Sequence, residues 1–250
     1  MKGLFRHPVR VAYRLPWLMT EFALAALNYA RWCGRNAPAG KRALWLQKSS
    51  RRVLRVLSTE ICASGSVPKS GLLVSNHLSY LDILVIASIT PAMFVAKREV
   101  KSWPVFGFFA KLAGTLFVDR ERRTRVGQTT GEIDAALKEG ALVVLFPEGT
   151  SSDGKTVLPF RSSLLEPATH QTNALFASHI QYQLEDGDVG EEVCYWRDEH
   201  TLVPHLMNLL AKKNVRAEVR FMQLRESSTD RKELAKQLHS EILRLKEATA

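Results

Sequence analysis

A histidine and an aspartate five residues apart, His77 and Asp82, are the side chains of this chain best suited to acid–base chemistry. A neutral imidazole titrates close to neutral pH, so one of its nitrogens can take a proton from an alcohol. A carboxylate bonded to the other nitrogen fixes the tautomer and stabilises the imidazolium that forms. The alternative is structural: Asp82 only caps a helix, and His77 is an ordinary loop histidine.

The local pattern places His77 between a strand and a helix. The stretch from Gly71 reads G-L-L-V-S-N-H, and an apolar run before small polar residues predicts a buried strand that ends in a turn. Ser79 as N-cap, with Asp82 three residues later and the apolar run 83–86 after it, predicts the start of a helix. The carboxylate therefore belongs to the first helical turn, where it points back toward the histidine.

Polar residues also follow two later strands of the predicted sheet. The runs 115–118 and 141–146 are apolar and read as strands, and each stops abruptly at residues that can bind a ligand. Ligands of open α/β sheets bind beyond the carboxyl ends of the strands, so we expect these residues to meet at one edge. In chain order, the candidate site residues are His77, Asp82, Arg120, Glu148, Gly149 and Thr150.

The chain beyond Gly71 alternates short apolar runs with helical stretches, which predicts an α/β fold with a mostly parallel mixed sheet covered by helices. Helices are expected at 126–139 and from Asp230, and a half-buried strand at 215–221. The aromatic stretch 103–113 is able to line a channel for an acyl chain, or to pack in the core.

The positive charge of the protein is concentrated at its N-terminus. The 250 residues include 35 Lys and Arg against 25 Asp and Glu, but residues 1–60 alone hold twelve basic and two acidic residues. The other 190 residues are balanced, with 23 of each, whereas a nucleic-acid enzyme spreads its basic surface along the substrate path. We therefore expect no nucleic-acid partner, and we divide the chain into a basic membrane-associated segment (1–60) and an α/β domain (61–250).

The N-terminal segment contains an apolar run, 15–30, that is interrupted by Pro16 and Glu21 and is short for a bilayer span. We expect two helices, 8–35 and 41–57, that form a pair lying in or dipping into one leaflet of a membrane. The alternative is an ordinary amphipathic helix packed against the core.

Three sequence blocks in this order resemble the PlsC-like glycerolipid acyltransferases, the family of the lysophosphatidic acid acyltransferases. The blocks are N-H-L-S-Y-L-D at 76–82, G-T-L-F-V-D-R at 114–120 and F-P-E-G-T at 146–150, and the similarity covers roughly residues 50–165. Three ordered blocks are far more specific than any one of them.

The resemblance implies roles for the candidate residues. His77 would be the general base and Asp82 its partner, while Arg120, Glu148, Gly149 and the adjacent Thr150 would help bind the acyl acceptor. It also implies an acyl-CoA or acyl-carrier-protein donor, no metal, no bound cofactor, and a monotopic or N-terminally anchored enzyme on the cytoplasmic face of the inner membrane. The three scattered cysteines fit a reducing compartment and offer no metal site.

Two departures from the family pattern concern the acceptor. Ser151 and Ser152 follow the third block where a basic residue is common, which weakens the case for a phosphomonoester head group. The fourth block is replaced by A-L-F-A-S-H-I at 174–180, without a proline. Over residues 158–205 the chain looks closer to the branch that acylates lyso-ornithine lipid or related lyso-lipids.

The sequence thus predicts a membrane-associated O-acyltransferase that transfers an acyl group to the hydroxyl of a lyso-lipid, either lysophosphatidic acid or lyso-ornithine lipid. One alternative is a serine-type lipid esterase, although the chain has no G-x-S-x-G elbow. The other is a non-catalytic basic module that binds membranes, which explains residues 1–60 but not the polar strand ends.

Overall fold

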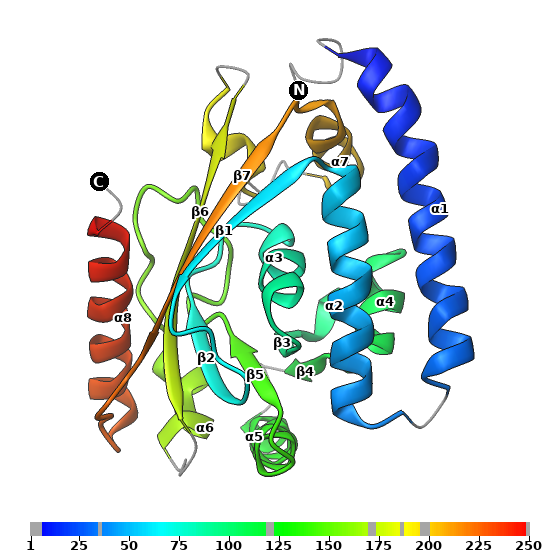
Figure 1. Cartoon of the computed structure of the whole chain (residues 1–250). Coiled ribbons are helices and arrows are strands. Elements are labelled where there is room, and N and C mark those ends of the chain that lie inside the picture. Colours follow the sequence, from blue (N-terminus) through cyan, green and yellow to red (C-terminus); the bar gives the residue numbers. More distant parts are fainter. Residues whose placement is uncertain are drawn as a thin grey trace.

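A single mixed β-sheet forms the centre of the protein (Figure 1). The computed structural model describes residues 7–34, 37–118, 123–169, 174–185, 188–195 and 201–248, with residues 123–130 described by their backbone alone. Within these residues the sheet has seven strands in the order β1-β7-β6-β2-β5-β3-β4. The strands are β1 (Thr59–Gly65), β2 (Gly71–Ser75), β3 (Met93–Lys97), β4 (Leu116–Val118), β5 (Leu142–Leu145), β6 (Leu175–Leu184) and β7 (Val215–Gln223).

Most strand pairs in this sheet are parallel, as the sequence predicts. Strands β6, β2, β5, β3 and β4 run in one direction, and β7 pairs antiparallel with β6 and parallel with β1. The carboxyl ends of β2, β4 and β5 therefore lie at the same edge. The edge strand β1 was not predicted, because its half-exposed sequence T-E-I-C-A-S-G lacks a clear apolar run.

Helices cover both faces of the sheet, with α8 on one side and α1, α2 and α3 on the other (Figure 1). The predicted helices are present with ends within a few residues of those expected, and part of the aromatic stretch 103–113 is itself a helix, α4. The helices are α1 (Pro8–Trp32), α2 (Ala39–Val56), α3 (Leu81–Ile89), α4 (Phe106–Leu112), α5 (Arg123–Lys138), α6 (Glu166–Thr169), α7 (Leu202–Ala211) and α8 (Arg231–Glu247).

The alternation of side chains along the strands creates two separate hydrophobic cores. In β2, Leu72 and Val74 point toward α5 and α8, whereas Leu73 points toward α2 and α3. All three side chains are fully buried, which is why a strand covered on both faces reads as a continuous apolar run.

The N-terminal helices share the second of these cores with the rest of the chain. Leu18 and Ala25 of α1 and Trp45 and Leu54 of α2 are buried in the same cluster as Leu73. The structure describes no helix whose length and apolar content would let it cross a bilayer. Helices α1 and α2 thus pack against the α/β core through one side.

Arg14 fixes α1 to the end of α7. Its guanidinium is buried and donates hydrogen bonds to the main-chain carbonyls of Leu210 at 3.1 Å and of Lys212, and to the hydroxyl of Ser58. The last carbonyls of a helix have no partner within the helix, and a buried cation satisfies them and complements the helix dipole.

Replacement of Arg14 by Met is expected to lower the free energy of unfolding by about 2–4 kcal/mol, because buried carbonyls lose a charged donor. The melting temperature should fall by roughly 5–10 °C, measured by calorimetry or circular dichroism. The exposed Arg31 of the same helix is the matched control, and Arg31→Met should change stability by less than about 0.5 kcal/mol. Equal stability of the two variants would contradict this role of Arg14.

Candidate active site

His77 lies in the loop between β2 and α3, where the sequence placed it. Asn76 follows directly after β2, and its side chain continues the hydrogen bonding between β2 and β6. The amide of Asn76 donates to the carbonyl of Ile180 at 3.0 Å and accepts from the N–H of Ile180 at 2.8 Å. An asparagine side chain thus replaces a backbone pair, and the chain can turn without leaving buried groups unpaired.

Asp82 holds the histidine as predicted. Its Oδ2 lies 2.7 Å from His77 Nδ1 and also accepts the N–H groups of Leu78 at 2.7 Å and Ser79 at 3.0 Å. Ser79 completes this arrangement, because its hydroxyl accepts the N–H of Leu81 at the start of α3. Asp82 therefore binds the loop before α3 and orients the imidazole at the same time. The N-cap of α3 is Tyr80, without a side-chain hydrogen bond, so the predicted capping by Ser79 was wrong, and the role of the pair in proton transfer stays a prediction.

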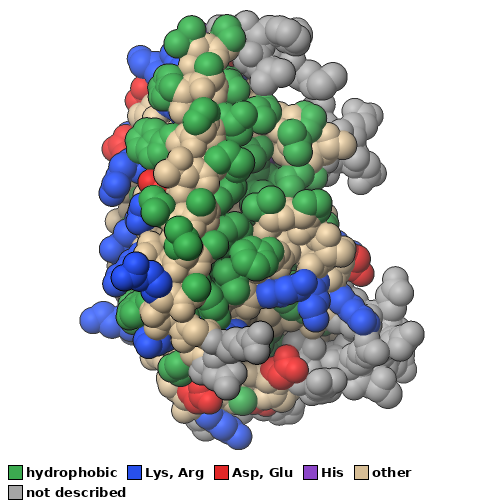
Figure 2. Space-filling view, turned by 90° about the vertical axis from the view of Figure 1, so that its right-hand side faces the viewer, with side chains coloured by type: hydrophobic (Ala, Val, Ile, Leu, Met, Phe, Trp, Pro, Cys, Tyr) green, Lys and Arg blue, Asp and Glu red, His purple; other side chains and the backbone are tan. Residues whose placement is uncertain are grey.

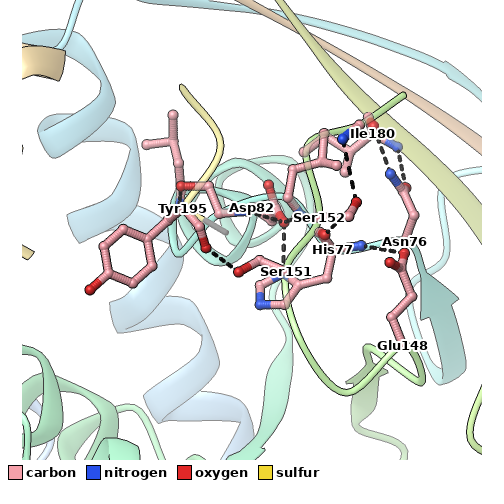
Figure 3. Close-up of polar contacts among 12 residues, drawn as sticks. Asn76, His77, Asp82, Glu148, Ser151, Ser152, Ile180 and Tyr195 are labelled. Atoms are coloured by element: carbon pink, nitrogen blue, oxygen red, sulfur yellow. Dashed lines mark hydrogen bonds and ion pairs between the residues drawn. The ribbon is translucent and has the colours of Figure 1, made fainter. Parts of the chain in front are cut away.

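The remaining groups of His77 are also restrained (Figure 3). Its carbonyl accepts the N–H of Ser152 at 2.9 Å, and its ring stacks on Phe146 with centroids 4.2 Å apart. The ring nitrogen Nε2 points away from Asp82, on the side of a cavity that His77 helps to line. A fixed imidazole at a cavity wall, with its second ring nitrogen turned away from the carboxylate, has a geometry that suits a general base.

Glu148 binds the backbone of the loop that carries His77. The carboxylate is 3% exposed, and it accepts the N–H of His77 at 2.9 Å and the N–H of Leu158 at 3.3 Å. Burial raises the pKa of Glu148 to about 8, against the two N–H bonds that lower it, and the negative charge of Asp82 adds to the rise. The structure thus gives Glu148 contacts to the backbone of the site, and its predicted role toward the acceptor stays a prediction.

Of the other three candidate residues, the structure describes two, Gly149 and Thr150. Gly149, with φ of +73°, and Thr150 line the cavity beside His77, so the turn after β5 brings them where the sequence expected them. A positive φ at this turn suits glycine and strains any other residue. Arg120 lies outside the described residues, although β4 ends at the same sheet edge two residues earlier, at Val118.

The cavity beside His77 has a volume of about 420 Å³ and is lined mainly by apolar and aromatic side chains. It lies between α2, α3, α4 and the ends of β3 and β5, and Lys97 at the end of β3 is among its lining residues. The stretch 103–113 supplies much of one wall, which agrees with the expectation that this stretch lines a channel. Its lining residues from that stretch are Trp103, Phe106, Phe109, Ala110 and Ala113.

Tyr80 and His205 form a buried pair at the cavity that the sequence did not indicate. Tyr80, in the second half of the loop after β2, donates its hydroxyl to Nδ1 of His205 at 2.9 Å. The other nitrogen of His205 faces the carbonyl of Cys194 at 3.2 Å, which fixes the tautomer that can accept from a tyrosine. His205 is thus a buried partner of a cavity residue, and the sequence analysis did not single it out.

The comparisons with known proteins identify the class to which this fold and site belong. A family model described as "Acyltransferase" matches residues 60–182, a range that holds both His77 and Glu148. The lyso-ornithine lipid O-acyltransferase of Brucella abortus is 36% identical over 184 residues, which cover 68% of this chain and 69% of that protein. The chain therefore belongs to the PlsC-like acyltransferase family.

Two further comparisons set the limits of the likeness. The 1-acyl-sn-glycerol-3-phosphate acyltransferase of Neisseria gonorrhoeae is 34% identical over 52% of this chain and 54% of its own length. The crystal structure of the 1-acyl-sn-glycerophosphate acyltransferase PlsC from Thermotoga maritima aligns with a TM-score of 0.59 over 95% of this chain and 98% of that one. At 18% identity this structure shows a shared fold.

Replacement of Glu148 by Gln is expected to flatten the pH dependence of stability. The pKa of Glu148 is about 8 in the folded protein against an ordinary 4.5, so the folded state retains a proton that the unfolded state releases. Its contribution to stability is complete below about pH 4.5 and is lost as the pH rises through 8. The unfolding free energy of the wild type, measured with urea between pH 4.5 and 8.5, should therefore decline more steeply than that of the variant, and parallel curves would contradict the assignment.

Proposed function

We propose that this protein transfers an acyl group from an acyl-CoA or acyl-carrier-protein thioester to the hydroxyl of a lyso-lipid, in membrane lipid biosynthesis. The observation that carries the proposal is the position of His77. Its Nδ1 is bonded to a buried carboxylate, its ring is stacked on Phe146, and its Nε2 is directed to the side of an apolar cavity.

In the proposed reaction, His77 Nε2 takes the proton of the lyso-lipid hydroxyl as that oxygen attacks the thioester carbonyl carbon. The new carbon–oxygen bond gives a tetrahedral intermediate, and loop N–H groups stabilise its oxyanion. The carbon–sulfur bond then breaks, and the imidazolium returns the proton to the leaving thiolate. Asp82 stabilises the imidazolium throughout, so no enzyme nucleophile is required.

The acyl chain would occupy the aromatic part of the cavity. Trp103, Phe106 and Phe109 present a wall that holds hydrocarbon without unpaired polar groups, and burial of methylene groups is worth about 0.8 kcal/mol each. Glu148 would keep the loop of His77 in place, while Gly149 and Thr150 border the acceptor and Arg120 would bind its head group.

For the acceptor we propose lyso-ornithine lipid first and lysophosphatidic acid second. The relative from Brucella abortus, with the longer matched region, carries the first name, and the relative from Neisseria gonorrhoeae carries the second. The sequence after the third block supports this order. Ser151 stands near the position of a common basic residue, and its hydroxyl donates to the carbonyl of Tyr195, so this position offers a phosphomonoester no cation.

We further propose that the protein works at the cytoplasmic face of the inner membrane with α1 against the bilayer. Figure 2 shows a largely apolar face along α1, with basic side chains at its margin. Exposed apolar residues of this kind, rimmed by Lys and Arg, are typical of interfacial helices. On α1 and α2, and on α4 with its N-cap residue, they include Val9, Tyr13, Trp17, Met19, Leu27, Trp32, Leu44, Val105 and Phe108.

This face is connected to the cavity through packed aromatic rings. Phe109 of α4 contacts Phe22 of α1 at 5.3 Å and Trp45 of α2 at 6.2 Å between ring centroids, and Phe109 also lines the cavity. Phe108, its neighbour, is 52% exposed. A lyso-lipid that leaves the bilayer beside α4 would thus have a short apolar path toward His77.

Replacement of His77 by Ala is expected to lower acyl transfer by roughly 10²-fold or more, because the general base is lost. The assay measures thiol release and, by mass spectrometry, the acylated product from lyso-ornithine lipid and from lysophosphatidic acid, each with acyl-CoA and acyl carrier protein. His7→Ala, at the far end of α1, is the histidine control and should retain activity. Near wild-type rates in His77→Ala would contradict the mechanism. A covalent acyl-enzyme trapped by quenching would also contradict it, and would favour a serine esterase.

Replacement of both Leu27 and Phe108 by Asp is expected to weaken binding to vesicles of anionic phospholipid by at least tenfold, because two charges must enter the interface. Val67→Asp is the control, since Val67 is also exposed but lies in the loop before β2, at the opposite end of that strand from His77. Flotation with vesicles measures the effect. Equal binding of the double variant and the control would contradict the assignment of this face.

A further inference from the structure

The oxygen of Asp82 that does not touch His77 has its own dedicated donor. The hydroxyl of Tyr182, on β6, donates to Asp82 Oδ1 at 2.7 Å, and both side chains are buried. The two residues are one hundred positions apart, so the contact exists only because β6 runs beside β2 in the sheet.

The two carboxylate oxygens of Asp82 accept different numbers of hydrogen bonds. Oδ2 receives His77 Nδ1 and two backbone N–H groups, whereas Tyr182 is the donor that the described chain provides for Oδ1. Asp82 has no exposure to solvent, so water cannot replace a missing donor. Without Tyr182 the charge on Oδ1 would be buried and unbalanced, a costly situation in a protein interior.

Tyr182 is also suited to remain a donor under all working conditions. Burial, followed by the negative charge of Asp82, raises the pKa of Tyr182 well above its ordinary value of 10. The hydroxyl therefore keeps its proton, and its ring is fixed in the core that includes Ile180 and Val219.

We propose that Tyr182 is a positioning residue of the acyl transfer reaction, acting through Asp82 on the charge and orientation of His77. This inference rests on the proposed function. Tyr182 is not among the described residues that line the cavity, so the proposal gives it a role behind Asp82 and no contact with the acyl donor or acceptor. With the backbone of Ile180, which holds Asn76, it makes β6 the support for both ends of the N-H-x-x-x-x-D segment.

The physical consequence is specific to catalysis. A carboxylate that loses the Tyr182 donor concentrates its charge toward the imidazole, which favours the imidazolium form of His77 before substrate arrives. A histidine that is already protonated cannot accept the proton of the hydroxyl. Removal of the hydroxyl should therefore move the acidic limb of the pH–rate profile to higher pH and lower kcat, while KM for both substrates stays unchanged.

The test is the variant Tyr182→Phe, which keeps the ring and removes only the hydroxyl. We expect kcat at neutral pH to fall roughly tenfold, the scale of one lost hydrogen bond to a charged group, together with the shift of the acidic limb. Tyr29→Phe is the matched control, because it removes the hydroxyl of another buried tyrosine, on α1, that is not among the described residues lining the cavity, and it should leave the acidic limb at its wild-type position. In an Asp82→Asn background, Tyr182→Phe should have no further effect on kcat.

The outcomes separate this inference from the proposed function. If Tyr182→Phe leaves the acidic limb in place, or lowers the rate equally in the Asp82→Asn background, the inference is wrong and the residue serves stability alone. If Tyr182→Phe fails to fold, 3-fluorotyrosine is incorporated at position 182, because it keeps the hydroxyl bonded to Asp82 and makes it a stronger donor. The acidic limb should then move to lower pH, and an unchanged limb in this folded protein overturns the inference. Full activity of His77→Ala, in contrast, would refute the proposed function itself.

Discussion

A carboxylate with no access to water must find its donors inside the protein, and the site depends on the way Asp82 does so. Asp82 itself lies in the first turn of α3, and its partners come from the loop after β2 and, through Tyr182, from β6. One buried charge thereby joins three segments and sets the direction of the His77 ring. Because unbalanced burial would cost several kcal/mol, these segments cannot move apart while Asp82 is ionised. The orientation of the imidazole is thus a consequence of electrostatic satisfaction as much as of packing.

Other buried hydrogen bonds also fix the loop that carries His77. Asn76 continues the pairing of β2 with β6, Glu148 binds the N–H of His77, and Ser152 binds its carbonyl. Of the two buried carboxylates, Glu148 is kept near neutral charge by burial, with Asp82 close by, so the pair does not place two full negative charges in one small volume. The N-terminal helices complete the enclosure, since Phe109 connects their aromatic side chains to the cavity wall.

Sequence reasoning reached the elements and most of the candidate site, but not the contacts between distant residues. Strands β2 and β5 were predicted because strands covered on both faces are uniformly apolar. Strand β1 was missed because its edge position leaves it half exposed. The burial of His205 was also missed, because nothing in its local pattern indicates that the hydroxyl of Tyr80 lies beside it.

The sequence by itself determined the alternation of strands and helices after Gly71, the pairing of His77 with Asp82 and the strand ends that carry Glu148, Gly149 and Thr150. These features depend on residues within a few positions of one another, where apolar periodicity and helix capping act. Only the tertiary structure decided that Tyr182 stands behind Asp82, that Glu148 holds backbone N–H groups, and that α4 links the N-terminal helices to the cavity. Those contacts arise from the order of strands in the sheet, which is set by packing over the whole chain and leaves no local mark in the sequence.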